Sequence, residues 1–214
     1  MKILNSNSSC YLTEVQETFS DAEVLNTIFK DYLFPKSLHG CLDMCSVSSN
    51  TLNDSRVVIS PPPRIEAGVF FLCNSSHQKV GAISFTFSNN GSTTNTYLTK
   101  VKAVVKASER GQGFFTEMFT LISWFANQFL QCDYAQIGVV DTAPQVAGKL
   151  DERAVTNYET TDTSLVNVPY DSVVQKQLNI VDYANAFSEE DWSGISLVVG
   201  DTTVPIPTKG VPEL

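Results

Sequence analysis

The stretch that decides the fold is Val104-Val105-Lys106-Ala107-Ser108-Glu109-Arg110-Gly111-Gln112-Gly113-Phe114-Phe115-Thr116. An apolar strand pattern runs into a Gly-x-Gly turn, and a long amphipathic helix pattern starts immediately after it. Such a turn presents the free backbone N–H groups of the first helical turn to an anion, and the helix dipole adds to the attraction. Gly111 and Gly113 allow backbone conformations, and a close ligand approach, that a Cβ atom would obstruct. We therefore expect a phosphate-binding turn.

The charges near this turn favour the same ligand. Lys100, Lys102, Lys106 and Arg110 lie within eleven residues that contain a single acid, Glu109. This basic patch stands out because the whole chain of 214 residues carries 14 basic and 23 acidic side chains, a formal charge of −9. The alternative interpretation is a purely structural glycine turn whose lysines are solvated strand residues.

The acidic balance, with a pI of about 4.6, excludes classes of partner. Nucleic-acid binding needs a surface rich in Lys and Arg, and anionic membranes repel a negative protein. We expect neither as a partner, and a cationic molecule or a basic protein fits better. No stretch approaches the roughly 20 apolar residues of a membrane span, and the N-terminus turns polar at Asn5, so we expect a cytoplasmic protein.

Hydrophobic periodicity predicts the elements around the turn. We expect strands at 69–73 and 80–87 joined as a hairpin by residues 74–77, a long strand at 96–106, the helix from Phe114, and strands at 134–141 and 195–199. In the long strand, Val101, Ala103 and Val105 share one face. Further helices are expected in the second half of 12–34, with a capping box at residues 20–23, and within 36–55, 145–153 and 173–187. The tail from Thr202 onward is expected to be extended.

This order of elements predicts an α/β fold of the α+β type. The strand–helix–strand unit at 96–141 implies one parallel β-α-β crossover, grafted onto antiparallel strands. We expect a mixed, mostly antiparallel twisted sheet with flanking helices. Residues 1–160 would form the main domain with its N-terminal helices, and residues 161–214 a C-terminal extension that completes or decorates it.

The segment Arg110-Gly111-Gln112-Gly113, after an apolar strand and at the start of an amphipathic helix, resembles the acyl-CoA-binding signature of the GNAT (Gcn5-related) N-acetyltransferase superfamily. The family pattern is Gln/Arg-x-x-Gly-x-Gly/Ala, so Arg110 and Gly113 match, whereas Phe115 replaces the last small residue. The resemblance covers roughly residues 65–150, and the element order agrees with a GNAT-like fold.

The resemblance implies that acetyl-CoA is the acyl donor, and we expect no metal. The diphosphate of CoA would lie on the turn formed by Arg110, Gly111, Gln112, Gly113, Phe114, Phe115 and Thr116, with Arg110 contacting phosphate oxygens. Val104 and Val105 would offer backbone groups to the pantetheine arm and the thioester carbonyl. The strand after the helix would splay away from strand 96–106 to admit the thioester between them.

The acid and base of the reaction are less clearly marked. The family often places a Tyr acid where this chain has Asp151, so we consider Tyr158 as the acid that protonates the departing thiolate, and packing as its other role. Asp141 is the candidate base, although it is equally suited to capping a helix. Solvent is the alternative route for the protons.

The leading hypothesis is therefore an acyl-CoA-dependent N-acyltransferase that transfers acetyl from acetyl-CoA to a primary amine of a small cationic molecule or a basic protein. The alternative is a catalytically weak GNAT-fold protein that binds or senses acyl-CoA and regulates a partner. A homodimer is one expected assembly. A third interpretation is an unrelated interaction protein with a coincidental glycine turn.

The five cysteines are odd in number and scattered, as expected for reduced thiols. His39, Cys41 and Cys45 are spaced like metal ligands, but they offer only three donors and lack a second pair to close a tetrahedral zinc site. We expect small buried thiols near a helix.

Overall fold

A computed structural model describes residues 1–30, 36–52, 67–89, 96–130, 132, 134–140, 155–157, 173–179 and 192–207, with only the backbone in parts of these ranges. In chain order the elements are β1 (Lys2–Asn5), β2 (Tyr11–Glu14), α1 (Phe19–Phe29), α2 (Leu38–Leu52), β3 (Ala67–Cys73), β4 (Lys79–Asn89), β5 (Thr96–Val105), the 3₁₀ turn η1 (Ala107–Glu109), α4 (Phe114–Phe129), β6 (Tyr134–Val140), β7 (Val155–Asn157), β8 (Val173–Asn179), β9 (Ile195–Val199) and β10 (Thr202–Val204).

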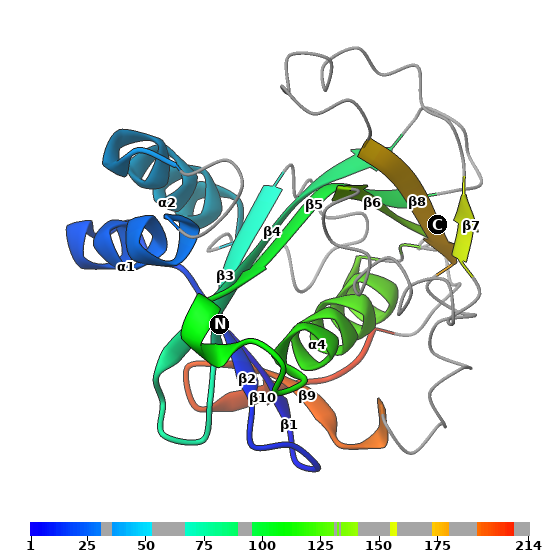
Figure 1. Ribbon diagram of the computed structural model, residues 1–214. Helices are drawn as coiled ribbons and strands as arrows, with labels where there is room; N and C mark the ends of the chain where they lie inside the picture. Colours follow the sequence, from blue (N-terminus) through cyan, green and yellow to red (C-terminus); the bar gives the residue numbers. More distant parts are fainter. Residues whose placement is uncertain are drawn as a thin grey trace.

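The strands of the described residues form one sheet in the order β10-β9-β1-β2-β3-β4-β5-β6-β8-β7. Neighbouring strands pair antiparallel except β5 and β6, which pair in parallel across the connection through α4. Helices α1 and α2 cover one face of the sheet and α4 covers the other (Figure 1). The prediction of an α+β fold with a mostly antiparallel sheet and flanking helices is confirmed.

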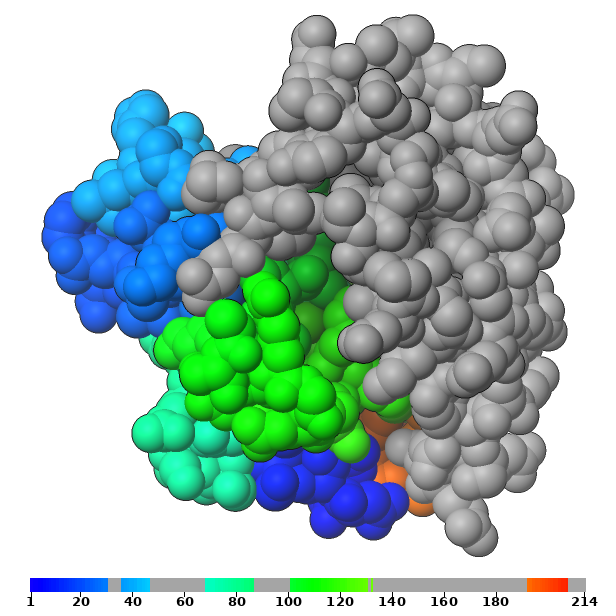
Figure 2. All heavy atoms as spheres, viewed as in Figure 1, coloured from blue at the N-terminus to red at the C-terminus, as the bar shows by residue number. Residues whose placement is uncertain are grey.

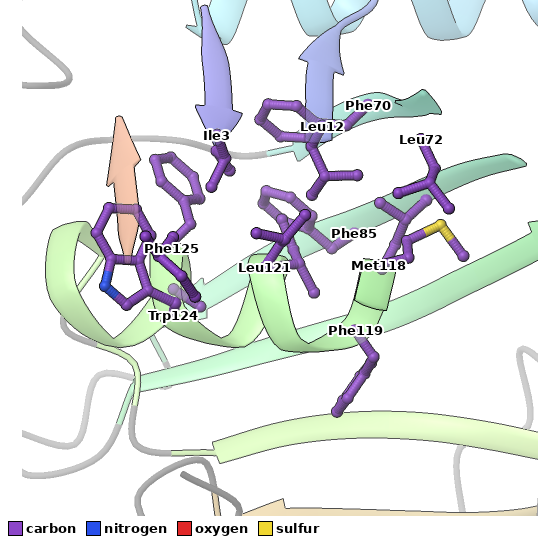
Figure 3. Close-up of a cluster of buried hydrophobic side chains, with 14 of the residues drawn as sticks. Ile3, Leu12, Phe70, Leu72, Phe85, Met118, Phe119, Leu121, Trp124 and Phe125 are labelled. Atoms are coloured by element: carbon purple, nitrogen blue, oxygen red, sulfur yellow. The ribbon is translucent and has the colours of Figure 1, made fainter. Parts of the chain in front are cut away.

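Two apolar cores lie on the two faces of the sheet. The α4 face holds the larger core, in which Leu121 and Phe125 pack against Ile3, Leu12 and Phe70 (Figure 3). The α1/α2 face holds a second core, built from α1, α2 and the alternate side chains of β3 to β5. Strand alternation explains the division, because successive side chains of one strand point to opposite faces.

Strand β5 shows this alternation as predicted. The side chains of Val101 and Val105 are buried in the α4-face core and Ala103 packs against it, whereas Val104 is buried in the core of the other face. Lys102 is exposed. The long strand thus contributes to both cores and ends at the edge where the glycine turn begins.

Several local predictions were wrong. The capping box at residues 20–23 is not the start of α1, because Thr18 is the N-cap and its hydroxyl accepts from the Asp21 amide at 3.1 Å. The helix expected at 173–187 is wrong over its first part, where β8 pairs with β6 over seven registered residues. Strands β1 and β2 were not predicted. The helix expected at 145–153 lies outside the described residues.

The C-terminal segment from Trp192 joins the same sheet and the same core. β9 pairs with β1, β10 pairs with β9, and Ile195 and Leu197 are buried in the α4-face core. The stretch expected to be an extended tail therefore begins with the edge strand β10.

All five cysteine side chains are buried, and none of them forms a disulfide. Cys41 and Cys45 lie on α2 and form part of the second core, which confirms them as small buried thiols near a helix. His39 instead points to solvent and lies 3.9 Å from the carboxylate of Asp43. Among the residues that the structure describes, no group of three or more His, Cys, Asp or Glu side chains is arranged to hold a metal ion.

Within the same described ranges, none of the helices combines the length and apolar character that a membrane span requires.

Candidate functional site

The glycine turn begins where β5 ends. After Val105 the chain makes the single 3₁₀ turn η1, Arg110 returns to an extended conformation, and α4 starts at Phe114. Gly111 has φ +82° and Gly113, the N-cap of α4, has φ +84°. This left-handed conformation disfavours any residue with a Cβ atom. A Cβ at either position would meet no atom within 4 Å, so conformation and not space requires the glycines.

The backbone amides of this turn have no acceptor in the described part of the chain. The first hydrogen bond of α4 runs from the Glu117 amide to the Gly113 carbonyl at 3.2 Å, so the amides of residues 113–116 precede the helical ladder. Gly113 has no side-chain oxygen to cap them. Residues 111–113 are exposed, and the green surface that includes the turn lies open in Figure 2. The arrangement therefore fits an anionic group at the start of α4.

Hydrogen bonds within the turn and to the end of β5 hold the side chains of Glu109, Arg110 and Gln112. The carboxylate of Glu109 accepts from Gln112 Nε2 and from Ser108 Oγ, both at 3.4 Å. Arg110 Nε donates to the Val105 carbonyl at 3.2 Å, back toward the strand. Gln112 is thus held beside Glu109, and Arg110 beside the end of β5.

One hydrogen bond fixes the direction of the backbone groups along the end of β5. The Lys106 amide donates to the Val80 carbonyl at 2.9 Å, which makes Lys106 and Val80 a hydrogen-bonded pair of the β4–β5 ladder. Because hydrogen-bonded and non-bonded pairs alternate, Val104 directs its N–H and C=O toward β4. Val105 and Ala103 direct theirs away from β4, toward the side of β6.

The pairing of β5 with β6 stops before these groups. The parallel register ends at Val101 opposite Ile137, although β5 continues to Val105 and β6 continues to Val140. In this last part β6 is registered with β8. The backbone groups of Ala103 and Val105 therefore face a position where the parallel ladder has ended.

The architecture matches solved acetyltransferases along most of its length. Apo FdhC, a nucleotide-linked sugar GNAT, superposes with a TM-score of 0.65 at 13% identity, covering 89% of this chain and 98% of that one. A spermidine N-acetyltransferase SpeG chimera from Vibrio cholerae and hSSAT gives a TM-score of 0.60 at 11% identity, covering 83% and 100%. The fold is that of the GNAT acetyltransferases. Comparison of the sequence with protein-family models and with curated proteins finds no match.

A third match is a mutant form of the spermidine/spermine N-acetyltransferase SpeG from Vibrio cholerae, with a TM-score of 0.61 at 10% identity, covering 83% of this chain and 98% of that one. At such identities the likeness concerns the fold. The resemblance drawn from the glycine turn is thus confirmed for the architecture.

The structure gives a position to each residue that the sequence predicted to bind the donor. Arg110, Gly111, Gln112 and Gly113 form the turn, while Phe114, Phe115 and Thr116 form the first turn of α4 and are half-buried. Val105 presents its backbone to the β6 side, but Val104 presents its backbone to β4. Ala103 shares the orientation of Val105 and was not among the predicted residues, because the side-chain period of a strand does not reveal which neighbour its amides face.

The predicted catalytic residues Asp141 and Tyr158 both lie outside the described residues. They stay predictions from the sequence.

Proposed function

We propose that this protein is an acyl-CoA-dependent N-acyltransferase that uses acetyl-CoA as donor and a primary amine as acceptor. The observation that carries the proposal is the row of turn amides, residues 111–116, that have no acceptor among the described residues and open the central helix of a GNAT fold. Such amides, together with the helix dipole, suit the diphosphate of CoA. Arg110, the two glycines and Gln112 would frame it.

The end of β5 would hold the rest of the donor. With the diphosphate at the start of α4, the pantetheine arm would run along Ala103 and Val105, whose backbone groups face the β6 side. Amides in that position can hydrogen-bond the arm and the thioester carbonyl. A donor aimed at that carbonyl oxygen stabilises the negative charge that develops on it during attack.

The reaction is direct transfer. The amine nitrogen forms a bond to the thioester carbon, the carbon–sulfur bond breaks, and the proton lost by nitrogen is returned to the departing thiolate. Tyr158 is proposed as the acid and Asp141 as the base, with solvent as the other carrier of protons. The products are an N-acyl amine and the free thiol of CoA.

The net charge of −9 supports a cationic acceptor, either a small amine or a basic protein. Two of the solved structures of similar fold bear names that point to polyamines and to a nucleotide-linked sugar. A panel of acceptors should therefore include spermidine, amino sugars and a lysine-rich peptide.

The test has two stages. Thermal unfolding is first followed with and without acetyl-CoA, and a donor that binds the folded state raises the melting temperature. Release of free thiol is then followed with the amine panel. Stabilisation with release supports the acyltransferase, whereas stabilisation without release from any amine supports an acyl-CoA-binding protein. If acetyl-CoA neither stabilises the protein nor releases thiol, the proposed function is wrong.

A further inference from the structure

We propose that Gly81 on β4 is a positioning residue for the acyl donor, because its lack of a side chain lets the end of β5 lie where the backbone of Val105 can receive the pantetheine arm. The inference rests on the proposed function, which assigns that backbone to the donor. Gly81 itself lies on the neighbouring strand, so it acts through β5 and not by contact with the donor.

The backbone of β5 leaves no room for a side chain at Gly81. Gly81 pairs with Val105 across the β4–β5 ladder. A Cβ atom at Gly81 would lie 2.8 Å from the Val104 carbonyl oxygen and 3.6 Å from the Val105 Cα atom. Non-bonded carbon atoms pack best about 3.5–4.0 Å apart, so the contact with the oxygen is a steric clash. Because that oxygen belongs to the backbone, no side-chain rotation relieves the clash, and the end of β5 would have to move.

The clashing carbonyl belongs to the same peptide group as the Val105 amide. A peptide group is planar, so a displacement of the Val104 C=O tilts the Val105 N–H with it. The Val104 carbonyl is directed toward β4 and the Val105 N–H toward the side of β6, where the donor is proposed to lie. A side chain at Gly81 would therefore misdirect a backbone group on the opposite side of β5.

A β-bulge explains why β4 and β5 are so close at this point. Cys73 of β3 pairs with Lys79 and Leu72 pairs with Gly81, so Val80 is an extra residue on β4. A bulge bends its strand and increases the local twist. The Val80 carbonyl accepts from the Lys106 amide at 2.9 Å, which holds the end of β5 against the bent part of β4. A glycine in a strand often marks such a close approach of another backbone.

Gly68 on β3 provides a matched control. Gly68 pairs with Phe85 of β4, and a Cβ atom at Gly68 would lie 2.6 Å from Cζ of the Phe85 ring. That ring is buried in the α4-face core. Gly68→Ala and Gly81→Ala therefore both crowd a strand of the same sheet. Only Gly81→Ala crowds the backbone of β5.

The experiment measures CoA affinity by titration calorimetry for the wild type and both variants, after circular dichroism has shown that each is folded. Overpacking should lower the melting temperature of both variants by about 2–12 °C. We expect Gly81→Ala to bind CoA about tenfold more weakly than the wild type, as for the loss of one hydrogen bond, and Gly68→Ala to bind within about twofold. Equal losses in the two variants, or unchanged affinity in Gly81→Ala, would overturn the inference.

A second measurement needs no donor. Amide hydrogen exchange at Val104 and Lys106, whose N–H groups face β4, should be faster in Gly81→Ala than in the wild type, relative to the amides of α4. It should be unchanged by the same comparison in Gly68→Ala. Unchanged exchange in Gly81→Ala would overturn the positioning role. A wild type that does not bind CoA contradicts the proposed function, whereas the effect of Gly81 on β5 is still judged by exchange.

A second pair of variants tests the same strand end if Gly81→Ala does not fold. Lys106 has φ −49°, close to the value of about −65° that proline requires. Lys106→Pro removes the amide that donates to Val80, whereas Lys106→Ala removes only the side chain. We expect Lys106→Pro to bind CoA about fivefold more weakly than Lys106→Ala, the equivalent of one hydrogen bond. Equal affinities of these two variants would show that the hold of β4 on β5 does not matter and would overturn the inference.

Discussion

Phe115 and Phe119 lie one turn apart on α4 and stack, with ring centroids 6.1 Å apart and planes 6° apart. Phe115 stands where the GNAT signature has a small residue. Its ring packs along the helix onto Phe119, which is buried and points away from the other labelled side chains of the cluster in Figure 3. Because the ring of this bulky residue stacks on Phe119, we expect the departure from the signature to be compatible with donor binding.

This stack predicts that Phe115→Ala lowers stability and spares CoA affinity. Removing a half-buried ring loses apolar contacts, so we expect the free energy of unfolding in urea to fall by about 1–3 kcal/mol. CoA affinity should stay within about threefold of the wild type, because the amides are unchanged. Phe19→Ala is the control, since the Phe19 side chain is 58% exposed and its loss should cost little. A tenfold or greater loss of CoA affinity in Phe115→Ala would show that the ring contacts the donor.

The positive φ of Gly113 predicts that Gly113→Ala is costly for both stability and binding. A Cβ in the left-handed conformation costs about 1–2 kcal/mol, which lowers the melting temperature by about 2–8 °C. If the turn relaxes to avoid the strain, the amides move and CoA binding weakens. Gly40→Ala in α2 is the matched control, because Gly40 is helical and its added Cβ meets its nearest neighbour, Ser37 Oγ, at 3.4 Å. An equal effect of the two substitutions on CoA affinity would contradict this role of Gly113.

The carboxylate of Asp21 connects α1 to the sheet. It accepts from the Gln16 amide at 2.8 Å and forms an ion pair with Lys79 on β4. The Lys79 ammonium also lies 4.3 Å from the centroid of the Phe71 ring. Because Asp21 is nearly buried, we expect Asp21→Asn to lower the free energy of unfolding by about 1–3 kcal/mol.

The control for Asp21 is Asp43→Asn. Asp43 lies 3.9 Å from His39 in an exposed pair, and such pairs contribute at most about 0.5 kcal/mol on a helix surface. Urea denaturation of both variants checks the comparison. Similar small losses would mean that the Asp21–Lys79 pair adds nothing to the docking of α1.

The buried thiols predict a loss of stability in alkali. Burial, followed by the charge of Asp21, raises the pKa of the Cys45 thiol to about 11. Above the ordinary thiol pKa of 9.0 the unfolded chain ionises first, so this group favours the folded state less and less as pH rises from about 9 to 11. Below pH 9 the thiol is neutral in both states and the contribution is complete.

Cys45→Ala isolates this contribution. Loss of the side chain lowers the free energy of unfolding of this variant by the same amount at every pH. Between pH 9 and 11, however, its free energy of unfolding should fall less steeply than that of the wild type. Urea denaturation at several pH values measures both curves. Parallel curves over this range would contradict a raised pKa at Cys45.

The central part of the fold was predictable because its signals are local. The alternation of residues 101–105, the two glycines and the period of α4 each specify one element, and their order specifies a strand, a turn and a helix. The candidate binding turn follows from the same residues. Gly111 and Gly113 lie in the turn that the sequence predicts, and their positive φ values explain why glycine is needed at both positions.

The errors arose where distant contacts decide the structure. Residues 173–179 have no clear alternation, and they form a strand because β6 pairs with them along their whole length. Strands β1 and β2 have four residues each, too few for a periodic signal. In α4 the polar side chains of Thr120, Ser123 and Asn127 form a stripe that a sequence pattern places in solvent, yet all three are buried.

The central claim is that the amides at the start of α4 receive the diphosphate of CoA. Amide nitrogen–proton correlation spectra of the isotope-labelled protein, recorded during a titration with CoA, test it residue by residue. We expect the amide signals of Gly111–Thr116 to shift in a saturable way, more than those of residues on α1 and α2. Saturable binding of CoA that leaves these amide signals in place would contradict the claim.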